Sequence, residues 1–345
     1  MRPARMPNSE IVHFLDSATG DFIESRGHVF HVGIAGRIHW ITLPLSFDRR
    51  LLAASRVARR ALRLDKANAV FVENRSAVVF AYQGALYRWT SDSNELVRTG
   101  TLKQCRNVLH QGIAVVDENR IFIGEYGHNA AREAVPVWGS PDAGRSWSVV
   151  YEFPARTIKH VHGVYPDPFS DDLWIPTGDF EGECFLYRTD PNFSRMEKFG
   201  DGSQTWRTVA LLFEPDRIYW IMDSQLETSH LFELDRRTGV LRRGRSFPGP
   251  VWYVKQLQDN FSVAQTTVEI GPGVRSDSAH LFVSRDNETW IEVAKFKKDL
   301  WPMRYFKFGV LAFADGPQTS QNFALFGEAL QGFDGQARIC SLQWP

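Results

Sequence analysis

The sequence has few cysteines, no net charge and no long hydrophobic run, and each absence excludes a class of protein. Its 345 residues contain three cysteines, Cys105, Cys184 and Cys340. The number of cysteines is odd, and their spacing in the sequence does not match a metal-binding motif. We therefore expect buried, reduced thiols in a cytoplasmic protein rather than a disulfide framework. Forty basic and forty acidic residues cancel, so no overall field recruits nucleic acid or an anionic membrane, and any electrostatic role must be local.

The N-terminal residues 1–20 include Arg2 and Arg5 but no apolar core of a signal peptide. No run of about eighteen apolar residues occurs elsewhere in the chain. We therefore expect neither a transmembrane segment nor secretion. The sequence assigns no oligomeric state.

A turn motif recurs at a regular spacing along the chain. Residues 140–147 fit the Asp-box pattern S-x-D-x-G-x-[ST]-W, in which Asp142 accepts hydrogen bonds from turn amides, Gly144 takes a positive φ and Trp147 packs under the turn. Relaxed forms of the motif contain Asp92, Asp190 and the pair Asp286 and Trp290, and a different turn at Asp235 fills the remaining place. The five aspartates are 50, 48, 45 and 51 residues apart, which is the period of a four-stranded propeller blade.

This period predicts an all-β chain, a β-propeller that uses residues 1–345 as a single domain. Two strands within 28–45 favour seven blades, with six as the alternative. The C-terminal part provides only three strands for its blade. We expect the N-terminal strand 11–16 to complete it, so that strands from both termini close the propeller and remove exposed edges.

One short helix is predicted near residues 49–63, between the N-terminal strands and the first full blade. Leu51, Leu52, Ala58 and Leu62 form an apolar stripe beside a strongly basic face. We expect the helix to pack on the propeller through this stripe and to keep its arginines in solvent. The alternative is a basic amphipathic helix that binds a membrane or an acidic polymer.

Polar residues gather where chemistry is expected in a propeller. Inner strands begin, and second strands end, on the same face, because the two are antiparallel neighbours. The starts of the inner strands carry His110, His160, His162, Arg207 and Tyr253, and the ends of the second strands carry Glu125, Tyr126, Asn129, Asp179, Asp223 and Glu269. Basic or aromatic groups therefore face acidic groups around one mouth.

Within this set, the sequence His160-Val161-His162 places two imidazoles on one face of a strand. With His110 from the adjacent blade, these histidines offer three nitrogens for a possible divalent metal, and Glu125 or Asp179 then serves as oxygen ligand or base. We predict His110, Glu125, His162 and Asp179 as catalytic. The predicted substrate-binding residues are Tyr126, Asn129, His160, Arg207, Asp223, Tyr253 and Glu269.

Two reactions suit these residue types. Carboxylates that face one another across the channel can act as acid and base in glycoside cleavage. Histidine and tyrosine, with an arginine that neutralises a uronate, suit β-elimination from acidic sugars. In both cases aromatic rings at the mouth offer flat surfaces for sugar rings.

The chain resembles bacterial Asp-box propellers, often labelled sialidase-like or BNR-repeat proteins. The resemblance is carried by His110–Ala114, Gly124–Tyr126, the Asp box, His160–Gly163 and Thr177–Asp179. The resemblance covers about 65–330 and implies a propeller associated with carbohydrates. The chain departs from true sialidases, because its nearest approach to their Phe/Tyr-Arg-Ile-Pro motif, Arg37-Ile38-His39, lacks the proline and the preceding aromatic residue. Pectic-oligosaccharide lyases with histidine-bound metal are a parallel at the level of fold.

The sequence therefore predicts a carbohydrate-active propeller that binds an oligosaccharide or polysaccharide and acts as a glycoside hydrolase or uronate lyase. The alternative is a non-catalytic scaffold that binds a glycan or a protein partner in polysaccharide production. Spatial clustering of the polar residues separates the two.

Overall fold

The computed structural model describes residues 2–5, 9–342 and 344. Within these ranges the strands form seven antiparallel sheets of blade type, and the only α-helices are two short ones. Five sheets each consist of four strands that are consecutive in the chain. A sixth combines the last three strands with the first, and in the seventh two short strands share the place of the innermost strand. The chain is thus a seven-bladed β-propeller, and the prediction of seven blades is confirmed.

The chain divides into two compact units, which are described separately. The first comprises residues 1–69, 253–270 and 274–345. It contains α1 (Phe47–Ala53) and α2 (Arg56–Leu62). Its sheets are β2 (Ile11–Leu15), β3 (Phe22–Arg26), β4 (Val29–Ile34) and β5 (Arg37–Thr42); β23 (Val251–Gln256), β24 (Ser262–Thr266), β25 (Ser278–Ser284) and β26 (Ile291–Lys297); and β27 (Val310–Phe313), β28 (Phe323–Glu328) and β29 (Gln336–Ser341) with β1 (Arg2–Arg5).

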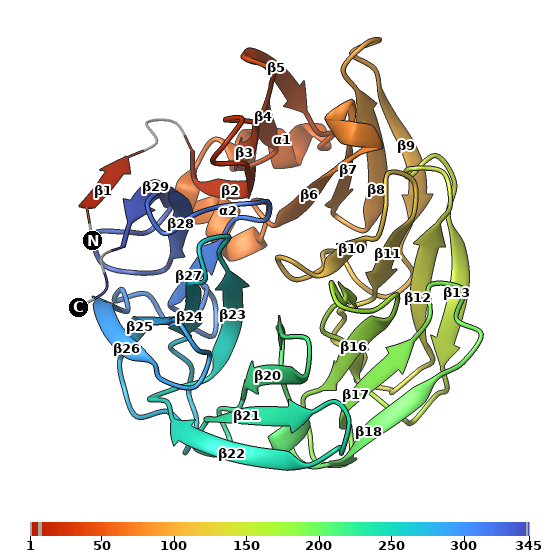
Figure 1. Ribbon diagram of the computed structural model, residues 1–345. Coiled ribbons are helices and arrows are strands. Elements are labelled where there is room, and N and C mark those ends of the chain that lie inside the picture. Colours follow the sequence, from red (N-terminus) through yellow and green to blue (C-terminus); the bar gives the residue numbers. More distant parts are fainter. Residues whose placement is uncertain (1, 6–8, 343, 345) are drawn as a thin grey trace. The chain divides into compact units, whose positions relative to one another are not determined.

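The second unit comprises residues 70–252 and 271–273. Its sheets are β6 (Ala67–Val72), β7 (Ala77–Tyr82), β8 (Ala85–Thr90) and β9 (Leu96–Thr101); β10 (Ile113–Val115), β11 (Ile121–Gly124), β12 (Val135–Ser140) and β13 (Ser148–Phe153); β14 (His160–Val161) and β15 (Tyr165–Pro166) with β16 (Leu173–Gly178), β17 (Cys184–Thr189) and β18 (Glu197–Gly202); and β19 (Leu212–Phe213), β20 (Arg217–Ile221), β21 (His230–Asp235) and β22 (Leu241–Ser246). Figure 1 shows β10 to β13 side by side in this order. Two 3₁₀ turns, Glu73–Arg75 and Gln204–Trp206, lie between strands.

The core of the second unit lies between neighbouring sheets, because alternate side chains of each strand point to opposite faces. On β11, Ile121 and Ile123 pack toward β6–β9, whereas Phe122 packs toward the β14–β18 sheet. On β16, Ile175 and Trp174 divide in the same way between two clusters. Each central strand is therefore buried on both faces.

The recurrent aspartate turns lie between the third and fourth strands of their sheets, as the spacing predicts. In the β12–β13 turn, Asp142 accepts hydrogen bonds from Ser146 N at 2.9 Å and from Ser146 Oγ at 2.6 Å. Gly144 has φ +83°, and Trp147 packs against the adjacent core cluster. In the β25–β26 turn, Asp286 accepts from the amides of Glu288 and Thr289, and Trp290 is buried. Asp92 occupies the corresponding β8–β9 turn.

One prediction about the N-terminal part is wrong, and one strand there was not predicted. The strand that completes the last sheet is β1 rather than residues 11–16, which form the first strand of their own sheet. The sequence pattern did not reveal β3, because its central residue Glu24 is a buried carboxylate that interrupts the apolar alternation. Ser9 Oγ and His31 Nδ1 contact this carboxylate.

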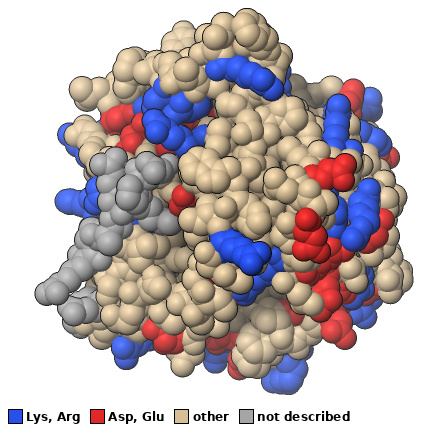
Figure 2. Space-filling model, turned by 90° about the horizontal axis from the view of Figure 1, so that it is seen from above, with Lys and Arg blue, Asp and Glu red and all other residues tan. Residues whose placement is uncertain are grey.

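The predicted single helix is two helices, α1 and α2, separated by Ala54 and Ser55. None of the described helices has the length and hydropathy needed to span a lipid bilayer. Cys105, Cys184 and Cys340 are free and buried, as predicted. Basic and acidic side chains are interspersed on the face in Figure 2, in keeping with the zero net charge.

Candidate functional site

Two histidines and one aspartate meet at neighbouring strand ends in the second unit. His160 lies on β14 and pairs with Gly178 at the end of β16, so the next residue, Asp179, lies beside it. The inner strand breaks after Val161, and β15 resumes at Tyr165. His162 lies in this break and still points to the side of His160, with ring centroids 5.0 Å apart. The antiparallel register thus brings the three side chains together.

The ring nitrogens of the two histidines have defined partners. In each ring Nδ1 lies at a backbone carbonyl: at 2.8 Å from Gly127 O for His160 and at 2.5 Å from Thr208 O for His162. Since a carbonyl oxygen can only accept, both Nδ1 atoms carry a proton. Both Nε2 atoms lie 3.3 Å from the same oxygen, Oδ1 of Asp179.

This arrangement favours a cation between the three groups. Both histidines are almost fully buried. Burial lowers the pKa of His160 to about 4, despite the opposing effect of Asp179, so its imidazole is neutral at neutral pH. A neutral imidazole that is protonated at Nδ1 presents a lone pair at Nε2. The Nε2 lone pair of His160 then faces a carboxylate oxygen, and a metal ion between the three groups would turn this repulsion into coordination.

The three residues fit a divalent metal. Among the described residues, His160, His162 and Asp179 are the one group of at least three possible ligands, with ligand atoms that all lie within 4.8 Å of one another. Imidazole and carboxylate ligands suit zinc, manganese and related ions. The contacts from Nδ1 to backbone carbonyls are those that fix metal-bound histidines in other proteins.

Positive charges surround the carboxylate of Asp179. Lys159 Nζ lies 2.5 Å from Oδ2, and Arg207 Nη2 lies 3.3 Å from Oδ1. The charges of Lys159 and Arg207 favour the ionised form of Asp179. Arg207 also pairs with Asp223 at 3.4 Å. Arg207 is therefore a buried cation that lies between two carboxylates.

Tyr126 covers the two histidines. Its ring centroid lies 4.2 Å from that of His160 and 6.0 Å from that of His162. Tyr126 is half-buried and thus more accessible than either histidine. Asn129 stabilises the loop that follows Tyr126. Its side-chain oxygen accepts from Glu133 N, and its side-chain nitrogen donates to the carbonyl oxygens of Glu133 and Lys159.

Glu125 lies in a different environment from the one that its predicted catalytic role requires. Its buried carboxylate accepts hydrogen bonds from Lys103 N at 2.6 Å, Gln104 N at 2.5 Å and Trp138 Nε1 at 2.8 Å. These three donors anchor the 103–104 loop to the blade. The group of possible metal ligands does not include Glu125, and its predicted role as acid or base stays a prediction.

His110 is also outside the ligand group, so the predicted set of three histidines is corrected to two histidines and Asp179. Tyr253, on β23, and Glu269, just after β24, both belong to the first unit. Their roles in substrate binding stay predictions.

Sequence reasoning missed Lys159 and Gln204. Lys159 directly precedes His160, so strict strand alternation predicts that its side chain points away from the histidines. In the structure Lys159 nevertheless reaches Asp179, because Asp179 lies beyond the end of its strand. Gln204 Nε2 donates to the carbonyl of Asp179 at 3.1 Å, and its amide oxygen accepts from Ser224 Oγ at 2.7 Å. The only signal for Gln204 was its closeness to Arg207 in the sequence.

No family model matches the sequence, and no curated protein matches it. The fold has similar solved structures. Oligogalacturonate lyase from Vibrio parahaemolyticus superimposes with a TM-score of 0.57 at 9% identity, over 98% of this chain and 91% of that one. A structure described as oligogalacturonate lyase in complex with manganese gives 0.51 at 9% identity, over 99% and 97%.

YCF48 from Cyanidioschyzon merolae is equally similar, with a TM-score of 0.58 at 12% identity over 99% of this chain and 98% of that one. At such low sequence identity, the similarity shows a shared propeller fold but gives no evidence about activity. The resemblance to sialidase-like BNR-repeat proteins stays an interpretation of the sequence.

Proposed function

We propose that this propeller holds a divalent metal between His160, His162 and Asp179 and acts there on an acidic oligosaccharide, as a lyase of uronate type. The observation that carries the proposal is the convergence of two Nε2 atoms on one carboxylate oxygen, with both Nδ1 atoms at backbone carbonyls. The similarity to propellers described as oligogalacturonate lyases agrees with it at the level of fold.

The chemistry of β-elimination suits the charges of the centre. When bound, a divalent metal polarises a carboxylate or carbonyl oxygen and so acidifies the adjacent C–H bond. Lys159 and Arg207 place fixed positive charge beside the centre, which favours an anionic substrate. Tyr126, half-buried against His160, is the group that we assign to the sugar, by stacking or by handling the proton.

Glycoside hydrolysis has less support. It needs two carboxyl groups that flank the scissile bond and can exchange protons. The carboxylate of Glu125 is occupied by three N–H donors, and that of Asp179 contacts two histidines, Lys159 and Arg207. The lyase therefore takes precedence over the hydrolase.

A non-catalytic scaffold is the second candidate, and the deep burial of both histidines favours it. A closed centre of this kind can brace the strand ends without contacting a ligand.

Two measurements on one set of proteins test the proposal. Calorimetric titration with Mn²⁺ should show binding to the wild type, and oligogalacturonide should yield an unsaturated product detected by ultraviolet absorbance. His162→Ala and Asp179→Asn should each weaken Mn²⁺ binding at least tenfold, the lower range for perturbed metal sites. The matched control His230→Ala removes a histidine whose Nδ1 also contacts a carbonyl, that of Thr228, and should bind like the wild type. Binding without turnover would favour the scaffold, and no binding would refute the metal site.

A further inference from the structure

Helix α2 has its polar and apolar faces reversed relative to a usual surface helix. Arg59 and Arg60 are 4% and 5% exposed, and Arg56 is half-buried on the same side. Val57 and Leu62 are both 48% exposed and lie on the opposite side with Ala61. A surface helix normally turns its apolar stripe inward. The expectation of a packed apolar stripe and solvated arginines is therefore wrong.

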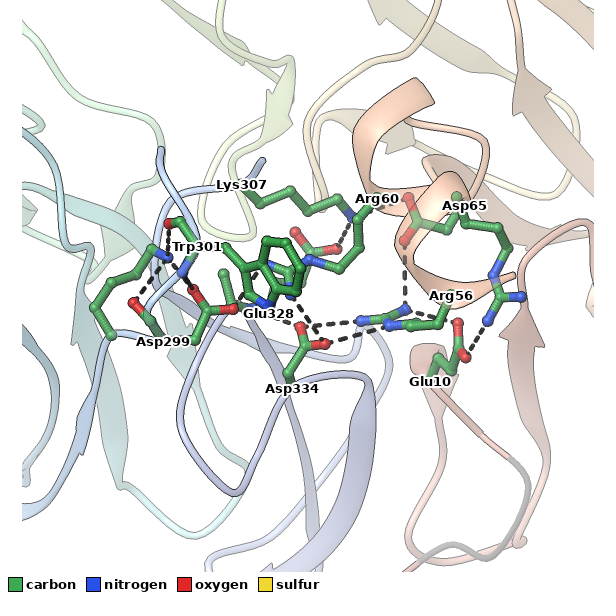
Figure 3. Close-up of polar contacts among 12 residues, drawn as sticks. Glu10, Arg56, Arg60, Asp65, Asp299, Trp301, Lys307, Glu328 and Asp334 are labelled. Atoms are coloured by element: carbon green, nitrogen blue, oxygen red, sulfur yellow. Dashed lines mark hydrogen bonds and ion pairs between the residues drawn. The ribbon is translucent and has the colours of Figure 1, made fainter. Parts of the chain in front are cut away.

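Acidic partners from distant parts of the first unit cause this reversal (Figure 3). Arg59 pairs with Glu10 at 2.5 Å, and Arg60 pairs with Asp299 at 2.8 Å. Arg56 contacts Glu10, Asp334 and Asp65 at 2.7, 3.1 and 3.4 Å. Since an unpaired buried charge is costly, these ion pairs fix the rotation of α2 about its axis. The apolar face of the helix must then point outward.

Helix α1 extends this outward apolar face. Phe47 is 78% exposed and Leu51, one turn later, is 65% exposed, while Ala53 on the other side is buried. Leu52 is exposed as well. α1 is tied to α2 by Arg59 Nη1, which donates to Ala53 O at 2.7 Å. The two helices together display large apolar side chains that, in the described part of the chain, remain solvent-exposed.

A loop with the same character lies beside α2. Arg60 holds it through the ion pair with Asp299 and through its position 5.6 Å from the ring of Phe306. Between these two anchors, Leu300 is 92% exposed, and Trp301 and Tyr305 are also exposed. Trp and Tyr are the residues enriched where a protein meets the headgroup region of a bilayer.

The exposed charge around these apolar groups is mainly positive. Residues 37–63 contain seven arginines and one acidic residue, Asp48. Three of the arginines are the ion-paired group on the inner side of α2. Arg37, Arg50 and Arg63 are exposed and Arg49 is half-exposed. The outer surface of this segment is thus apolar and cationic.

We propose that the outer faces of α1 and α2, with the 299–305 loop, form a docking surface for an anionic lipid membrane. The apolar side chains enter the headgroup boundary, and the arginines pair with lipid phosphates, as in interfacial helices of other proteins. Self-association is disfavoured, because a second copy would bring two surfaces of the same charge together. An acidic polymer would satisfy the arginines but leave the exposed leucines in water.

Vesicle cosedimentation of the full-length protein tests this surface. Binding is expected to phosphatidylcholine vesicles that contain phosphatidylglycerol, and not to phosphatidylcholine alone. Raising the salt from about 0.1 M to about 1 M shortens the Debye length from about 10 Å to about 3 Å and should weaken binding. Arg50→Gln with Arg63→Gln should lower the partition coefficient about fivefold for each arginine, the effect expected of one cation near an anionic surface.

A matched pair of variants isolates the apolar contribution. Val57→Ser removes a valine of the proposed surface, and Val240→Ser removes one of similar exposure, 48% against 52%, from the turn between β21 and β22. Val57→Ser should weaken vesicle binding severalfold, and Leu51→Ser with Leu62→Ser about tenfold or more. Val240→Ser should bind like the wild type. Since all these side chains are exposed, melting temperatures should stay within a few degrees of the wild-type value.

Three results would overturn the proposal. One is the absence of the vesicle binding described above, including its greater sensitivity to Val57→Ser than to Val240→Ser. Another is a dimer in sedimentation equilibrium that the double leucine variant dissociates, with no vesicle binding, which would assign the surface to a second copy. The last is binding to polyglutamate that is as tight as vesicle binding and insensitive to the leucines, which would assign the surface to an acidic polymer.

Discussion

The neutral, buried His160 makes a quantitative prediction for stability against pH. Its pKa in the folded protein is about 4, against 6.5 for an ordinary histidine, and burial is the main cause. Between pH 6.5 and pH 4 the unfolded chain binds a proton at this histidine and the folded protein does not. The free energy of unfolding therefore falls as the pH falls. The contribution is fully present above pH 6.5 and lost below pH 4. A difference of two and a half pKa units corresponds to about 3 kcal/mol of unfolding free energy.

The perturbation is His160→Asn, and the assay is urea unfolding in EDTA at several pH values between 4 and 7.5. Asn keeps a polar N–H near the carbonyl of Gly127 but does not titrate. The wild type should lose about 3 kcal/mol more than the variant between pH 6.5 and pH 4. His128→Asn, at an exposed histidine, serves as control and should follow the wild type. Parallel pH profiles for the wild type and His160→Asn would refute the neutral-imidazole argument on which the metal site rests.

Three further predictions test other parts of the structure. Glu125→Gln should lower stability by about 2 kcal/mol, because an amide cannot accept from all three donors to the carboxylate; Mn²⁺ titration of the same variant should give wild-type affinity, and a lost metal site would restore Glu125 to the centre. Glu10→Ala should cost about 3–5 kcal/mol in urea unfolding, since it leaves Arg59 buried without its carboxylate, and a loss below about 1 kcal/mol would show that the pair is solvated. Deleting residues 1–5 should lower the melting temperature clearly, because β1 pairs with β29 through four residues; an unchanged melting curve would contradict that role.

The blade pattern could be predicted from sequence because it depends on local chemistry. Each turn aspartate bonds amides two to four residues away, as in Asp142 and Asp286, so its spacing reports the blade directly. The strand alternation is equally local. Where a buried polar residue interrupts it, as Glu24 does in β3, the strand was missed, because the partners Ser9 and His31 are outside that strand.

Some residues of the candidate site could be predicted from the sequence and others could not, for the same reason. His160, His162 and Asp179 could be grouped from strand periodicity and the antiparallel rule alone. The role of Glu125 could not, because two of its donors come from the 103–104 loop, whose path no local pattern specifies. The orientation of α2 failed for a similar reason, since the partners of Arg59 and Arg60 are 49 and 239 residues away at Glu10 and Asp299.

Anomalous X-ray scattering at the manganese edge, from crystals grown with Mn²⁺, would locate a metal between His160, His162 and Asp179. We expect one strong peak bounded by Nε2 of His160, Nε2 of His162 and the carboxylate of Asp179, with both Nδ1 atoms still at the carbonyls of Gly127 and Thr208. An empty centre under saturating Mn²⁺, with both histidines in direct contact with Asp179, would contradict it.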